Sequence, residues 1–120
     1  QRILNAAGLV ALGTDFPIEH IDPLATFFAA TTRKDAKEWP EGGFLPEQRL
    51  SPAQTLMGMT RDAAYSAFGE DDYGSIRVGQ LANFTLLNTN LLDPASSPRS
   101  KTKVTRTIVS GKVLYIGKHE

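Results

Sequence analysis

The chain of 120 residues contains no cysteine. This absence excludes a disulfide framework, a thiolate metal site and a cysteine nucleophile. Oxygen or histidine nitrogen would have to hold any metal ion, and the only histidines are His20 and His119. Because the lack of cysteine does not assign a compartment, a cytoplasmic location is only the default expectation.

Long apolar runs and an excess of charge of one sign are also absent. Thirteen basic residues balance thirteen acidic residues, so the chain lacks the broad positive field that attracts nucleic acids and anionic membranes. No apolar run approaches the roughly 20 residues that span a bilayer, and the first residues do not have the layout of a signal peptide. We therefore expect neither a nucleic acid nor a membrane as a partner.

The first third of the chain predicts a strand, a turn and a helix. A chain of this length is ordinarily one domain that buries about two-thirds of its unfolded surface. A short helix from Arg2 to Ala7 is followed, after Gly8, by an apolar run from Leu9 to Leu12 that is typical of a strand buried on both faces. Asp22 and Pro23 then begin a helix that ends near Arg33.

The middle of the chain predicts a loop and two short helices. Residues 34–50 contain two prolines, a glycine pair and aromatic residues, which indicates an irregular loop whose aromatic side chains anchor it to the core. Ser51 and Gln54 form a capping-box pattern that begins a helix ending around Gly58. Thr60 is expected to cap a further helix from Arg61 to Phe68.

The C-terminal third is predicted to be β-structure. Beyond Tyr73 the sequence predicts a strand at residues 84–87 and a hairpin whose two-residue turn is Ser110 and Gly111. Residues 91–103 are expected to form a loop. This change divides the chain into a part from 1 to 73 and a part from 74 to 120.

Asp15 is the candidate functional residue. A carboxylate at the end of a buried parallel strand lies where α/β proteins place their catalytic groups. From the residues alone, however, a role in the turn before Pro17 is favoured, because aspartate is a good turn former. His20 and His119 form no H-x-H or H-E-x-x-H pair and are interpreted as surface or loop residues.

Five blocks in order carry a resemblance to a known family. They are LVALGTDFPIEHIDPL, AATTRKD, GGFLPEQRLSPAQTL, TRDAAYSAFGEDDYGSIRVGQLANFTLLN and VTRTIVSGKVLY. Together they resemble the C-terminal portion of metal-dependent amidohydrolases, in particular amidohydrolase family 3, which hydrolyses amide-like carbon–nitrogen bonds in small non-peptide substrates. Gly13-Thr14-Asp15 departs from the commoner Gly-Ser-Asp but keeps the hydroxyl.

The resemblance implies an α/β fold of a defined kind. Residues 1–73 would hold the last βα unit of a (β/α)₈ barrel, with strand eight, helix eight and additional helices, and residues 74–120 would supply C-terminal strands of a small β-sandwich accessory domain. Asp15 matches the family's aspartate that ligates a divalent metal, usually zinc, and acts as the general base.

The family's other metal ligands, its H-x-H motif, bridging lysine and further histidines, have no counterpart here. A complete barrel takes about 250 residues. We therefore expect this chain to be a C-terminal fragment that is inactive alone and binds no metal alone.

Two further expectations remain open. The chain is alternatively a non-catalytic binding or assembly module that pairs through exposed strand edges. If the fragment folds alone, we expect self-association, because the run from Leu9 to Leu12 and the helix face of Leu24, Phe27 and Phe28 would otherwise be exposed.

Overall fold

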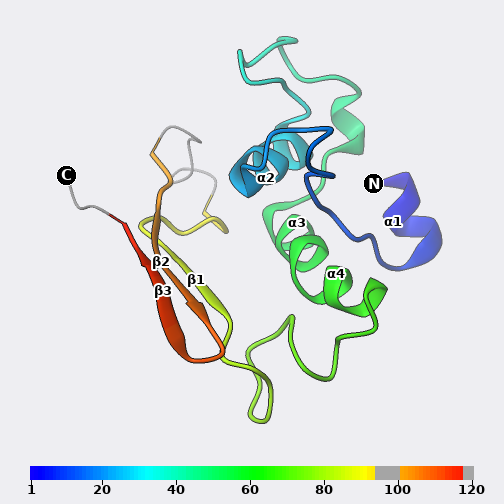
Figure 1. The fold of residues 1–120 in the computed structure, drawn as a ribbon. Coiled ribbons are helices and arrows are strands. Elements are labelled where there is room, and N and C mark those ends of the chain that lie inside the picture. Colours follow the sequence, from blue (N-terminus) through cyan, green and yellow to red (C-terminus); the bar gives the residue numbers. More distant parts are fainter. Residues whose placement is uncertain (94–100, 118–120) are drawn as a thin grey trace.

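The structure, a computed structural model, describes residues 1–93 and 101–117. Figure 1 shows the helices gathered on one side and the sheet, formed late in the chain, on the other. The elements are α1 (Arg2–Ala7), α2 (Pro23–Thr32), the 3₁₀ turn Pro46–Gln48, α3 (Pro52–Met59), α4 (Arg61–Ser66), β1 (Phe84–Leu87), β2 (Val104–Val109) and β3 (Lys112–Ile116). The described residues thus form a small α/β chain in which short helices precede a three-stranded antiparallel sheet.

The predicted starts of α2 and α3 are confirmed. The Asp22 carboxylate accepts a hydrogen bond from the backbone N–H of Leu24 at 3.0 Å, which satisfies a free donor of the first turn of α2. At α3, the Ser51 hydroxyl accepts from the Gln54 N–H at 3.1 Å, and the Gln54 side chain accepts from the Ser51 N–H at 2.8 Å. Both helices therefore begin with their caps formed, and α2 packs against α3.

Helix α4 begins at Arg61 as predicted, but its cap and its C-terminal end differ from the prediction. It ends at Ser66 rather than Phe68, and Thr60 provides no side-chain cap. The Thr60 hydroxyl instead donates to the carbonyl of Leu56 at 2.7 Å, in the last turn of α3. Phe68 has a left-handed backbone (φ 56°), which cannot continue a right-handed helix.

The predicted strand from Leu9 to Leu12 is wrong for this chain. These residues are irregular, and no strand occurs anywhere between residues 1 and 83. A strand needs a neighbouring strand to accept and donate its backbone hydrogen bonds, whereas here the Leu12 N–H donates to the carbonyl of Gly58 in α3 at 2.9 Å. The predicted burial on both faces is not observed either, because Leu9, Val10 and Leu12 are half-buried and Ala11 is exposed.

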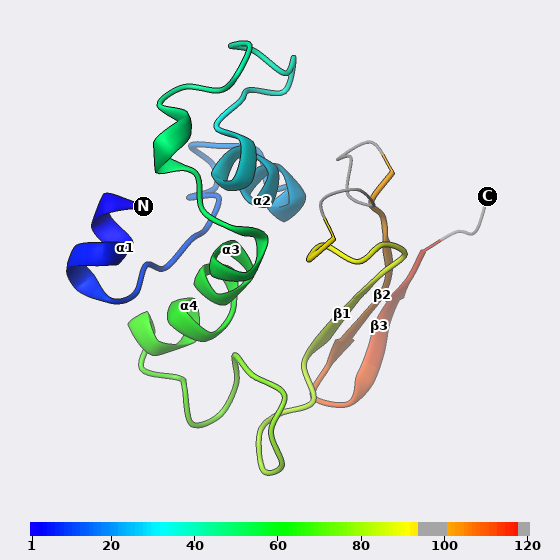
Figure 2. The ribbon, with the colours of Figure 1, turned by 180° about the vertical axis from the view of Figure 1, so that it is seen from behind.

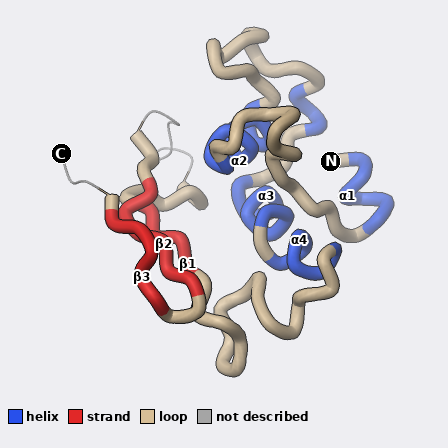
Figure 3. The backbone as a smooth tube through the Cα atoms, viewed as in Figure 1, coloured by secondary structure: helices blue, strands red, loops and turns tan. Residues whose placement is uncertain are grey.

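The predicted strand at 84–87 and the predicted hairpin are confirmed. The strand order is β1-β2-β3 with antiparallel pairing throughout. Ser110 and Gly111 form the turn with φ values of 49° and 78°, the pair of positive φ angles that matches the twist of a two-residue hairpin. Of the predicted loop at 91–103, residues 94–100 lie outside the described residues. Figure 3 shows the described loops and turns of the chain in tan.

The buried core is small. The buried apolar residues among those described are Phe27, Leu50 and Ala64. The accessible surface is 8672 Å², whereas a compact protein of this mass exposes about 6,400 Å². The expectation of one compact domain that buries about two-thirds of its surface is therefore not met, because none of the described residues forms a second layer over the sheet.

The main contacts between elements lie within the two groups. Helix α3 contacts α2 and α4, and the strands contact one another, but helices and sheet lie apart in both views (Figures 1 and 2). On α2, Phe27 is buried, and Leu24 and Phe28 are half-buried. The helix face that was expected to drive self-association is thus mostly covered within the chain, and self-association stays a prediction. The division of the chain at residue 73 stays a prediction.

Candidate functional site

Asp15 lies on an exposed turn beside the helices. It has a left-handed backbone (φ 50°), and its carbonyl accepts from the N–H of Ile18 at 2.8 Å. Aspartate tolerates this conformation better than most residues. The residues from Asp15 to Ile21 are all exposed. The carboxylate of Asp15 is therefore open to solvent and to any ligand or chain that approaches this turn.

The segment that leads to Asp15 is held against α3 at Gly58. This glycine is buried, and a Cβ atom placed on it would lie 2.8 Å from the Val10 carbonyl and 2.9 Å from the Leu12 side chain. Only glycine permits this approach, which also brings the Leu12 N–H to the Gly58 carbonyl. The position of the Asp15 turn thus depends on a glycine within a helix, a feature that sequence analysis did not single out.

The sequence contained a usable signal for Gly58. A glycine inside a helix costs about 1 kcal/mol relative to alanine, so its presence in α3 indicates a close approach of another segment. The sequence does not say which segment approaches. The structure identifies it as the run of Val10 and Leu12.

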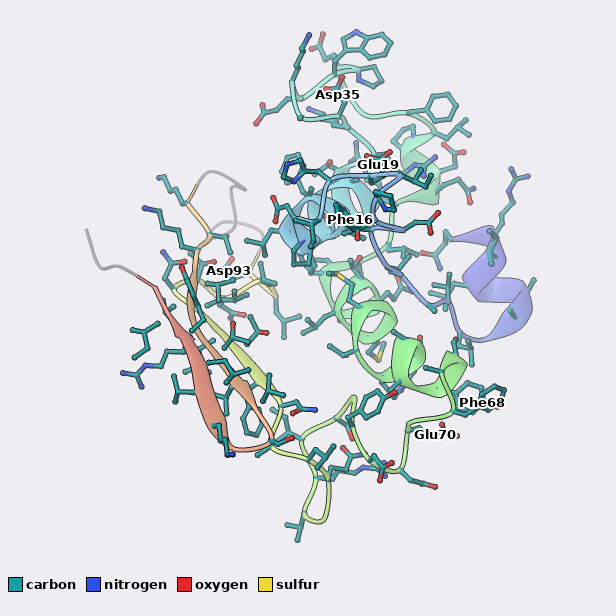
Figure 4. All side chains as sticks on the ribbon, in the orientation of Figure 1. Phe16, Glu19, Asp35, Phe68, Glu70 and Asp93 are labelled. Carbon is teal, nitrogen blue, oxygen red and sulfur yellow. The ribbon has the colours of Figure 1, made fainter. Side chains whose placement is uncertain are left out.

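The loop after Asp15 carries the other polar groups of this region. His20 is exposed, as predicted, whereas His119 lies outside the described residues. Figure 4 shows Phe16 and Glu19 on this loop, which also exposes Ile18 and Ile21. The turn therefore presents the Asp15 carboxylate on an exposed loop that carries both polar and apolar side chains.

The described residues do not fit a metal ion on their own. Within 1–93 and 101–117, no three His, Asp or Glu side chains are grouped so that they could hold one. Zinc is bound by about four ligands, and a single carboxylate supplies at most two oxygens. Asp15 could contribute to a metal centre only if other residues completed the ligand set.

Two arginines fix the loop of residues 33–50 to the end of α2. The Arg49 guanidinium donates to the Thr32 carbonyl at 3.2 Å and to the Gly42 carbonyl. The Arg33 Nε donates to the Phe44 carbonyl at 3.0 Å. These cations satisfy carbonyls at and near the C-terminus of α2, where the helix dipole favours positive charge.

The aromatic residues of this loop do not anchor it to a core. Trp39 and Phe44 are both mostly exposed, and Arg33 lies over the Phe44 ring at 5.7 Å. The predicted aromatic anchors are therefore wrong. The loop is ordered instead by hydrogen bonds to backbone carbonyls, which composition does not reveal.

Asp35 organises the tip of the same loop. Its carboxylate accepts from the N–H of Lys37 at 2.7 Å and from the N–H of Trp39 at 3.0 Å. The hydrogen bonds from Trp39 and Lys37 lower the pKa of the Asp35 carboxyl below its ordinary value, because they stabilise the charged form. The carboxylate thus stays ionised to a lower pH than a free aspartate.

Acid is expected to loosen this loop. A depressed pKa contributes stability that is present above the unfolded value of about 3.9 and is lost as the pH falls through the folded value. Trp39 is the single tryptophan, so its fluorescence should change with a midpoint below pH ~3.9. In Asp35→Asn, which keeps an acceptor oxygen but cannot titrate, this change should be absent. An identical titration in the variant would contradict the assignment.

Comparisons with known proteins found a family model and relatives that match most of this chain. The family model described as Amidohydrolase family matches residues 1–115. The chain is 38% identical to Protein LONG AFTER FAR-RED 3 of Arabidopsis thaliana, 29% to Putative amidohydrolase YtcJ of Bacillus subtilis and 26% to N-substituted formamide deformylase of Arthrobacter pascens.

Each match covers 96% of this chain but only 19%, 22% and 21% of the respective relative. The chain therefore spans about a fifth of the length of these relatives. As for membranes, none of the helices in the described ranges has the length and apolar character needed to cross one.

Proposed function

Because the chain belongs to the amidohydrolase family, we propose that it supplies the C-terminal part of a metal-dependent hydrolase that cleaves carbon–nitrogen bonds of small non-peptide amides. The supporting observation is the family match over residues 1–115, which includes the Asp15 turn and the segment that positions it. One relative is an N-substituted formamide deformylase, and loss of a formyl group from such a substrate breaks an amide bond.

In the proposed enzyme, the run from Leu9 to Leu12 is the last strand of a (β/α)₈ barrel, and α2 is the helix that follows it. The run is apolar and is followed three positions later by Asp15, which is the order that places a carboxylate at the catalytic end of a barrel. Strand pairing would then come from neighbouring strands that these 120 residues do not contain. Helices α3 and α4 would be additional helices, and β1 to β3 part of an accessory β-domain.

Asp15 has two proposed roles. It is one ligand of a divalent metal, in the family usually zinc, which when bound lowers the pKa of a coordinated water to about 7. Its second role is as general base, with a carboxylate oxygen accepting a proton from the attacking water and passing it to the leaving amine nitrogen. The reaction consumes one water and one amide and yields one carboxylate, here formate for a formamide, and one amine.

By itself, this chain is proposed to be inactive. The described residues provide one exposed carboxylate and no complete ligand set. The sequence has no H-x-H motif. The remaining ligands and the substrate pocket would come from the other segments of a complete hydrolase.

A chimeric enzyme, which we call the exchange enzyme, tests the proposal. In it, residues 1–115 replace the matching segment of the Arthrobacter pascens deformylase, and formate release from an N-substituted formamide is measured. We expect measurable turnover by the exchange enzyme and none by the isolated chain. Circular dichroism and sedimentation establish that the exchange enzyme folds; a folded exchange enzyme without turnover would contradict the proposal.

A non-catalytic assembly module is the second candidate function. The observation that favours it is the uncovered sheet, whose strand β3 is exposed along its whole length. An exchange enzyme whose turnover does not depend on Asp15 would favour this candidate.

A further inference from the structure

A tight turn joins Asp15 to two large apolar side chains. The N–H of Ile18 donates to the Asp15 carbonyl at 2.8 Å, which closes a turn from Asp15 to Ile18. The Cα atoms at the two ends of such a turn lie within about 7 Å of each other. Phe16 follows Asp15 directly and lies on the same loop (Figure 4). The turn therefore fixes both apolar residues next to the candidate functional residue.

Exposure alone does not assign a ligand to these side chains. Phe16 is 61% exposed and Ile18 76% exposed. The chain spans only about a fifth of its relatives, so other segments of a complete hydrolase would cover much of the surface that is open here. What distinguishes Phe16 and Ile18 from the other exposed apolar residues is that one backbone hydrogen bond holds their turn at the proposed general base.

The proposed proton transfer determines which part of the substrate lies over this turn. The carbon–nitrogen bond breaks, the nitrogen takes the proton from the Asp15 carboxyl, and the oxygen of the water stays on the carbonyl carbon. A group that delivers a proton comes within hydrogen-bond distance, about 3 Å, of the atom that receives it. The attacking water occupies the carbonyl side of the bond, so the substituent on the nitrogen is the part that extends over the turn.

We propose that Phe16 and Ile18 form the subsite for the nitrogen substituent, and that the substrates are amides whose leaving amine carries an apolar alkyl group. The inference rests on the proposed function, from which it takes the proton transfer by Asp15. The two side chains offer no polar atom, so a polar substituent would lose hydrogen bonds to water without gaining a partner. An alkyl substituent instead removes apolar surface of both partners from water.

The polar residues of the loop lie beyond the closed turn. Glu19 and His20 are exposed, and both follow the hydrogen bond from Ile18 that closes the turn. A nitrogen substituent that reached these residues would be polar rather than apolar. The test below therefore compares an apolar and a polar substituent of equal length.

A matched pair of substrates tests the subsite in the exchange enzyme. N-butylformamide and its hydroxypropyl analogue differ only in whether a methyl group or a hydroxyl ends the nitrogen substituent. We expect kcat/KM to be at least about tenfold higher for N-butylformamide, as is usual for such a difference in an apolar pocket. Ile18→Asn should lower this ratio at least about fivefold, because it places a polar side chain of similar size in the subsite. A merely structural defect would lower both values of kcat/KM and leave their ratio unchanged.

Ile76→Asn is the matched control. Ile76 is also an exposed isoleucine, with 85% of its surface open. It precedes Arg77, which donates to the Glu70 carbonyl at 3.3 Å, and Figure 4 shows Glu70 at the opposite end of the helices from Phe16. The ratio of the two kcat/KM values should change less than about twofold in this variant, as is usual for a distant surface substitution.

Three results would overturn the inference and leave the proposed function in place. They are an unchanged ratio in Ile18→Asn, an equal fall of the ratio in Ile18→Asn and Ile76→Asn, and a higher kcat/KM for the hydroxypropyl analogue. A folded exchange enzyme that turns over neither substrate would overturn both proposals.

A smaller exchange keeps the test independent of the folding of the large one. In it, only residues 15–18 of this chain replace the matching turn of the deformylase, and the ratio is measured with and without Ile18→Asn. The same fall of at least about fivefold is expected, and an unchanged ratio would contradict the inference.

Discussion

Asp15→Asn is expected to lower the kcat of the exchange enzyme by about 10² to 10⁴-fold. Asparagine has nearly the shape of aspartate, so the turn and its hydrogen bond from the Ile18 N–H to the Asp15 carbonyl should persist. The amide cannot accept the proton of the attacking water at neutral pH, and it is a much poorer metal ligand than a carboxylate. The measurement is formate release at saturating substrate.

Glu19→Gln is the matched control for this prediction. Glu19 is an exposed carboxylate on the same loop, and its neutralisation removes the same charge four positions away. Turnover should change less than about twofold, as is usual for a surface substitution. If Asp15→Asn and Glu19→Gln had equal effects, the loss would reflect local charge, and Asp15 would return to the role of a turn residue.

Gly58→Ala is expected to displace the segment that positions Asp15. The new Cβ atom would lie 2.8 Å from the Val10 carbonyl, a backbone atom that can move only with its segment. Overpacking of this kind typically costs 1–3 kcal/mol, about as much as or more than alanine gains in a helix. In the exchange enzyme, a displacement of Asp15 by about 1 Å would lower turnover by about 10²-fold.

Gly13→Ala is the control for Gly58→Ala. Gly13 belongs to the same segment, and a Cβ atom there would meet no atom within 4 Å. The free energy of unfolding of the chain, measured by urea titration, should be unchanged or slightly raised in Gly13→Ala, because alanine restricts the unfolded state. A Gly58→Ala chain as stable and active as the Gly13→Ala chain would show that the close approach at α3 is not needed.

The elements that sequence analysis predicted well are those with local causes. The capping box of Ser51 and Gln54 and the positive φ angles at Ser110 and Gly111 depend on a few adjacent residues. The same holds for Asp22 at the start of α2. Local hydrogen bonds and backbone preferences are determined by neighbouring residues in the sequence, so these elements form where the sequence pattern predicts them.

The elements that it predicted poorly depend on distant partners. The run from Leu9 to Leu12 has the composition of a buried strand, but pairing requires neighbouring strands, and none lies between residues 1 and 83. Thr60 could have capped α4, but its hydroxyl donates to the Leu56 carbonyl. In both cases the structure is determined by a competing contact that local secondary-structure propensity does not predict.

The candidate site shows the same division. The position of Asp15 after an apolar run is visible in the sequence, and the family match over residues 1–115 agrees with the resemblance on which its role rests. Its metal role stays a prediction. The support of its segment by Gly58 was not predicted, because it is a contact between residues more than forty positions apart.

The zinc content of three purified proteins tests the central claim most directly. The proteins are the isolated chain, the folded exchange enzyme and its Asp15→Asn variant, measured by elemental analysis after removal of loosely bound metal. We predict negligible zinc in the isolated chain, near-stoichiometric zinc in the exchange enzyme and a clear loss of zinc in the variant. Equal zinc in the exchange enzyme and its Asp15→Asn variant, or stoichiometric zinc in the isolated chain, would contradict the proposal that Asp15 supplies one ligand of a centre completed by other segments.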